Sequence, residues 1–91
     1  MEQIFMEFKN RDTGLQEWID VRHIYRVFPC PEPEHIGNAL VWLDIVDVVS
    51  GKPLVILADL DAVEFMDLLN RTIYMASNER NPTRRNHGKQ H

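Results

Sequence analysis

The middle of the chain carries two strand-like segments, Ala39 to Val49 and Leu54 to Ala58, that are apolar on both faces. In a strand that is buried on one side only, alternate residues are polar. Along the first segment, however, each set of alternate residues holds four apolar side chains out of five: Leu40, Trp42, Val46 and Val48 in one set, and Val41, Leu43, Ile45 and Val49 in the other. This pattern predicts that both faces of the sheet are covered, one of them by a partner.

Two earlier segments have the alternation of half-buried strands. Residues Ile4 to Phe8 alternate before the turn-like run Asn10 to Gly14, so we expect a hairpin there. The stretch from Trp18 to Phe28 alternates over its whole length, and we expect one long amphipathic strand. The turn signal Ser50 to Pro53 joins the two central apolar segments into a second hairpin.

A helix is predicted from about residue 61 to 77, because apolar side chains recur there at spacings of three and four residues. Asp61 and Glu64 have the spacing of a capping box at its start. Together the elements predict an α+β fold: an antiparallel sheet of about four strands in meander order, with one C-terminal helix packed on one face. We expect residues 1–79 to form a single domain and residues 80–91 to form a flexible tail.

The net charge of −4 is distributed unevenly along the chain. Residues 80–91 contain four basic residues and no acidic residue, so the remaining residues carry −8, the difference between −4 and +4. The four basic residues are candidate phosphate contacts: Arg80, Arg84, Arg85 and Lys89. Two features oppose binding to nucleic acid: the tail has no aromatic residue for base stacking, and an acidic body repels a duplex. A nucleic-acid-associated regulator that uses the basic tail is for this reason only an alternative function. A second alternative is an acidic nucleic-acid mimic that blocks a DNA- or RNA-binding enzyme.

Prolines at every second position from Pro29 to Pro33 predict a stiff surface loop. Within and after it stand four side chains of types that bind metals: Cys30, Glu32, Glu34 and His35. The paired ligand spacing of structural zinc sites is absent, and Cys30 lacks the helix N-terminus or basic pocket that activates a catalytic thiolate. We therefore expect no metal site and no catalysis here, and interpret the four residues as a rigid contact loop for a partner.

No combination of nucleophile, base and orienting group has convincing spacing, so we expect neither enzyme activity nor a cofactor. The longest apolar runs are far shorter than the roughly 20 residues that span a bilayer, so we expect no membrane partner. An acidic N-terminus and a single cysteine favour the cytoplasm.

The sequence thus predicts a small cytoplasmic protein–protein interaction module: an adaptor, regulator or inhibitor of a larger protein. The partner is expected to be a second copy, bound through the sheet face that carries either Leu40, Trp42, Val46 and Val48 or the alternative set. The alternation of the central strands does not say which of the two sets faces the helix.

Overall fold

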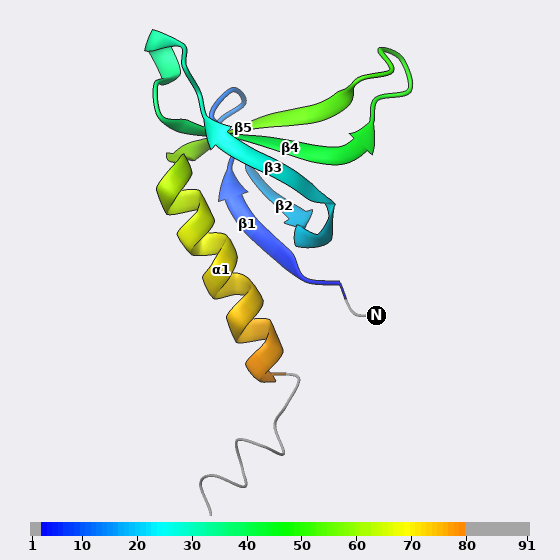
Figure 1. The fold of residues 1–91 in the computed structure, drawn as a ribbon, viewed down its shortest axis with the longest axis vertical. Helices are drawn as coiled ribbons and strands as arrows, with labels where there is room; N and C mark the ends of the chain where they lie inside the picture. The colour runs from blue at the N-terminus through cyan, green and yellow to red at the C-terminus, as the bar shows by residue number, and fades with distance from the viewer. Residues whose placement is uncertain (1–2, 80–91) are drawn as a thin grey trace, which may run out of the picture.

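The computed structural model describes residues 3–79, which form two antiparallel sheets and one α-helix (Figure 1). The first sheet pairs β1 (Phe5–Lys9) with β2 (Gln16–Asp20), and the second has the order β3 (Ile24–Pro29), β4 (Asn38–Val46) and β5 (Pro53–Asp61). The helix α1 (Ala62–Glu79) follows β5 directly. The α+β class with one C-terminal helix is therefore confirmed. The single sheet of about four strands is wrong, because the described chain has five strands in two sheets.

The expected long strand from Trp18 to Phe28 is interrupted by a 3-10 turn, Val21–His23. The turn is stabilised by Asp20, whose Oδ1 accepts a hydrogen bond from the backbone N–H of Arg22 at 3.0 Å. The chain changes direction there, so that β2 and β3 belong to different sheets. Alternation continues through the turn, which is why the sequence pattern did not reveal it. A single bridge, Asn10 to Ala58, links the two sheets in the described region.

The strand β1 and the helix α1 both cover one face of the β3–β5 sheet, and the core lies between them and that face (Figure 1). Phe8 of β1 and Phe65 of α1 meet edge to face, with ring centroids 5.6 Å apart. From β4, Val41 is completely buried and Leu43 is 5% exposed. The set that contains Val41 therefore faces the helix, and the set that contains Leu40 and Trp42 faces away from it.

Two projections flank the three-stranded sheet (Figure 1). One is the loop between β3 and β4, which contains the 3-10 turn Pro33–His35. The other is the far end of the β4–β5 hairpin, where residues 47–52 connect the two strands. We call them the proline arm (residues 30–37) and the hairpin arm (residues 44–54). Among the described residues, no helix combines the length and apolarity that a membrane-spanning helix requires.

Candidate interaction site

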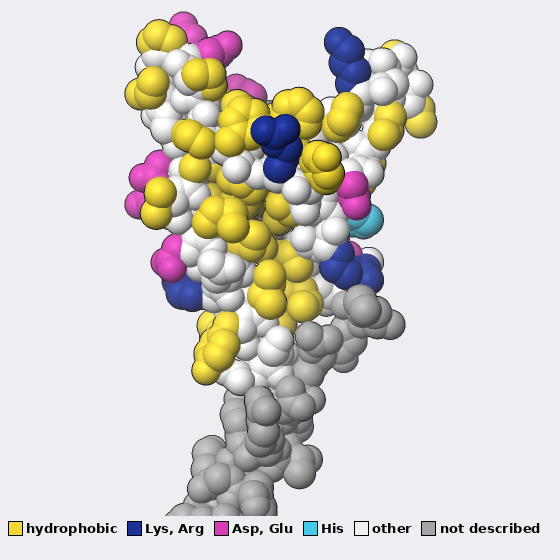
Figure 2. All heavy atoms as spheres, viewed as in Figure 1, with side chains coloured by type: hydrophobic (Ala, Val, Ile, Leu, Met, Phe, Trp, Pro, Cys, Tyr) yellow, Lys and Arg dark blue, Asp and Glu magenta, His cyan; other side chains and the backbone are white. Residues whose placement is uncertain are grey.

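The outer face of the β3–β5 sheet, which points away from the core, is mostly apolar. Strand register places its side chains in two rows that cross the sheet: Arg26, Trp42 and Val55 in one, and Phe28, Leu40 and Leu57 in the other. Figure 2 shows hydrophobic side chains gathered between the two arms, with a basic side chain among them. Within the described chain, no element lies over this face.

Arg26 lies over a pair of aromatic rings on the outer face. Its guanidinium carbon is 5.0 Å from the ring centroid of Phe28 and 5.7 Å from that of Trp42, and the two ring centroids are 6.0 Å apart. Such cation–π contacts hold a guanidinium in place without neutralising it. None of the ion pairs formed among residues 3–79 involves Arg26. The outer face therefore carries a positive charge that no carboxylate of the described chain balances.

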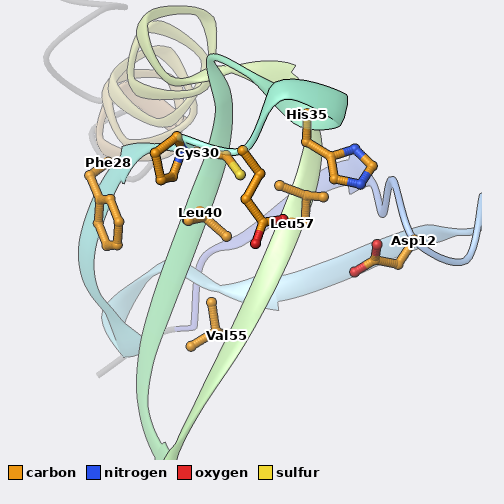
Figure 3. A pocket seen from close by; sticks show the side chains of 9 residues that line it. Asp12, Phe28, Cys30, His35, Leu40, Val55 and Leu57 are labelled. Atoms are coloured by element: carbon orange, nitrogen blue, oxygen red, sulfur yellow. The ribbon is translucent and has the colours of Figure 1, made fainter.

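A groove of about 470 Å³ opens where the outer face meets the proline arm (Figure 3). Six of its lining side chains are apolar or a thiol, and three are titratable. We call the first set the floor (Phe28, Cys30, Pro31, Leu40, Val55 and Leu57) and the second set the rim (Asp12, Glu32 and His35). The groove thus combines the properties of a protein-binding surface, an apolar centre and a polar edge.

The rim has two carboxylates without a cation. Arg11 donates from Nε to Nδ1 of His35 at 2.9 Å, and its Nη1 pairs with Asp59 at 2.9 Å. In the first hydrogen bond Nδ1 of His35 is the acceptor. The charge of Arg11 is balanced by Asp59. Since Asp12 and Glu32 form no ion pair within residues 3–79, the rim is negative.

The structure brings several of the predicted site residues together. Cys30, Glu32 and His35 of the predicted contact loop line the groove with Leu40 of the predicted interface, whereas Glu34 does not line it. Trp42 lies next to this groove on the outer face. The other predicted interface residues lie on the hairpin arm: Val46, 55% exposed, and Val48, 95% exposed. The predicted phosphate contacts of the tail, Arg80, Arg84, Arg85 and Lys89, lie outside the described residues.

Sequence reasoning missed Arg26, Phe28 and Asp12 as members of the site. Alternation along β3 places Arg26 and Phe28 on the same face of that strand. Only the pairing of β3 with β4 shows that this is also the face on which Leu40 lies. Asp12 belongs to the β1–β2 turn, which reaches the groove because Arg11 donates its backbone N–H to the carbonyl of Leu57 at 2.8 Å. No local sequence pattern predicts this hydrogen bond between Arg11 and Leu57.

His23 lies 2.8 Å from Asp44, but both side chains are about half exposed, at 44% and 52%, and the pair stands on the sheet surface. Cys30, the single cysteine, is 5% exposed. Within residues 3–79, no group of three or more His, Cys, Asp and Glu side chains is close enough to hold a metal ion.

Comparison of the chain with protein-family models, with curated proteins and with solved structures gave no match. Only the geometry and chemistry of the site therefore indicate a function for this chain.

Proposed function

We propose that this chain is a non-enzymatic cytoplasmic protein–protein interaction module. It forms a homodimer through the outer face of the β3–β5 sheet and acts as an adaptor, regulator or inhibitor of a larger protein. Cys30 is the only cysteine of the chain and is free, so the chain has no internal disulfide, which supports a reducing compartment.

The observation that carries the proposal is an apolar sheet face, opposite the core, that no element within residues 3–79 covers. Among the described elements, the helix and β1 pack on the inner face. Beside this face, the hairpin arm exposes further apolar side chains, since Val46, Val48 and Val49 are 55%, 95% and 90% exposed. A continuous apolar surface that is rimmed by charged residues marks an interaction site, because a monomer gains nothing from exposing it. A second chain on this face would remove that surface from water.

The test is the solution mass of the wild type and of Val55→Asp, measured by light scattering over a concentration series. Val55 is 44% exposed and lies on β5 opposite Trp42, at the edge of the outer face. We expect the wild type to form a concentration-dependent dimer. The substitution should raise the dissociation constant about 100-fold, because each dimer would bury two carboxylates against apolar surface.

Val63→Asp is the matched control, since Val63 is an equally branched residue that is 79% exposed on α1. It should leave the dimer intact. A folded wild-type monomer at every concentration would contradict the proposal. A Val55→Asp dimer as tight as the wild type would place the interface on another surface.

A further inference from the structure

We propose that the two copies pair in one register, in which Arg26 of each copy meets Glu32 of the other across the groove. The inference depends on the proposed homodimer and specifies its geometry. Arg26 is a cation without a carboxylate, and Glu32 is a carboxylate without a cation, within the described chain. Both belong to the same surface: Arg26 covers two rings of the outer face, and Glu32 lines the groove beside them.

Arg26 lies in β3, and Glu32 follows the end of that strand by three residues. The chain runs from Arg26 through the end of β3 at Pro29, and Glu32 still has extended backbone angles, φ −74° and ψ 137°. Six residues at about 3.3 Å each separate the two Cα atoms by at most roughly 20 Å. The row of Phe28, Leu40 and Leu57 crosses the sheet between them. An apolar centre is thus flanked by a positive and a negative end.

A two-fold axis that lies in the interface and crosses the strands near Pro29, midway between Arg26 and Glu32, makes this pattern self-complementary. Rotation about that axis reverses the direction of the strands but keeps β3 over β3 of the other copy. It therefore brings Arg26 over the position of Glu32, and Glu32 over that of Arg26. Two identical ion pairs result, as an isologous interface requires, and the apolar rows stack between them.

Other registers of the same two faces place like charges together. An axis through the row of Arg26 would set the two guanidinium groups opposite each other. An axis parallel to the strands would lay the two grooves over one another, and with them the carboxylates of Asp12 and Glu32. Juxtaposed like charges are unfavourable at an interface, so charge selects the register with reciprocal Arg26–Glu32 pairs.

The geometry of Arg26 suits this role. The rings of Phe28 and Trp42 already hold its guanidinium over the face, so binding need not order a free side chain. The groove offers an apolar floor and a negative rim to the incoming guanidinium. In the dimer each groove would be filled by the arginine of the other copy.

A charge exchange tests the register. The dimer dissociation constants of the wild type, Arg26→Glu, Glu32→Arg and the double variant are measured by analytical ultracentrifugation, with circular dichroism to verify folding. Each single reversal should weaken the dimer at least about tenfold, because it creates two repulsive pairs. The double variant restores both pairs with reversed polarity and should return to within about twofold of the wild type, apart from the lost cation–π contact.

Glu34→Arg is the matched control, because Glu34 lies on the same arm with its side chain exposed but does not line the groove. It should change the dissociation constant by no more than about twofold. If Arg26→Glu fails to fold, Glu32→Arg still tests the register from an exposed loop position, and its loss of affinity should shrink in high salt.

The possible failures are separable. Suppose that Val55→Asp dissociates the dimer, but Glu32→Arg leaves it unchanged or the double variant does not restore it. This result would overturn the register and keep the outer face as the interface. A wild type that is monomeric throughout would overturn the homodimer itself.

Discussion

At the scale of single residues, Asp20 shows how one carboxylate directs the chain. Its side chain is only 6% exposed, and it accepts hydrogen bonds from the backbone N–H and the guanidinium of Arg22, the shortest of them 2.8 Å. These hydrogen bonds lower the pKa of Asp20 from 3.8 to about 2, against the opposing effect of desolvation. The folded state therefore stabilises the ionised form of Asp20, whose hydrogen bonds stabilise the turn between the two sheets.

The lowered pKa predicts a dependence of stability on pH. Because the pKa is lower in the folded than in the unfolded chain, ionised Asp20 stabilises the fold above about pH 4, and this contribution is lost as the pH falls towards 2. Asp20→Asn keeps an acceptor oxygen but removes the charge. We expect its urea midpoint to lie below that of the wild type at pH 6 and to approach it near pH 2.

The exposed pair of Asp67 and Arg71 on the helix provides the control, with side chains 70% and 64% exposed. Asp67→Asn should change the midpoint little at either pH, since exposed ion pairs contribute little. A difference between Asp20→Asn and the wild type that is the same at both pH values would rule out the charge as its cause.

At the scale of elements, the start of α1 is determined by a few local hydrogen bonds. Oδ1 of Asp61 accepts from the backbone N–H of Glu64 at 2.8 Å, and Oε1 of Glu64 accepts from that of Asp61 at 3.3 Å. This is the reciprocal capping box that the sequence predicted, and the helix begins at Ala62 as a result. Since the cap follows β5 without a loop, it also sets where the core face of the helix meets the sheet.

Removal of the cap should destabilise the protein. Asp61→Ala leaves a backbone N–H of the first turn without its acceptor and should lower the free energy of unfolding by about 1 kcal/mol. Asp61→Asn retains an acceptor oxygen and should lose much less. Both are measured by urea denaturation. Equal losses in the two variants would indicate that charge at the helix end, not the hydrogen bond, supplies the stabilisation.

At the scale of the whole molecule, the described chain leaves more large apolar side chains exposed than it buries. Ten hydrophobic residues are buried, three of them alanine or cysteine at Cys30, Ala39 and Ala58, whereas sixteen large hydrophobic residues are exposed. The exposed set includes Val48, at 95%, and Val49, at 90%. A small domain buries a modest share of its surface, so association can add materially to its stability.

The proposed dimer makes a prediction about residues 80–91. Truncation after Glu79 should change the dimer dissociation constant by no more than about twofold, because Thr83 to His91 contain no aliphatic or aromatic residue to bury. The same proteins are titrated into a fluorescent DNA duplex at low salt. We expect no binding by either. Wild-type binding that truncation abolishes, and that falls steeply with salt, would favour the nucleic-acid alternative.

Local rules explain what the sequence by itself determined about this protein. The capping box and the apolar spacing of Phe65 and Leu69 predicted α1, and alternation with turn residues predicted the β1–β2 and β4–β5 hairpins. These features depend on residues a few positions apart, so a single chain segment contains them. The two-sided apolarity of the central strands predicted that both faces are covered, one of them by a partner, and the partner stays a prediction.

Only the tertiary structure decided which side chains occupy each face. The break at Val21–His23 depends on hydrogen bonds to Asp20, and strand pairing sets Arg26 and Phe28 beside Leu40. The groove needs β3, β4, β5 and the β1–β2 turn at once. Its residues are far apart in sequence, and strand register arises from packing over the whole sheet, so no local pattern could encode the site.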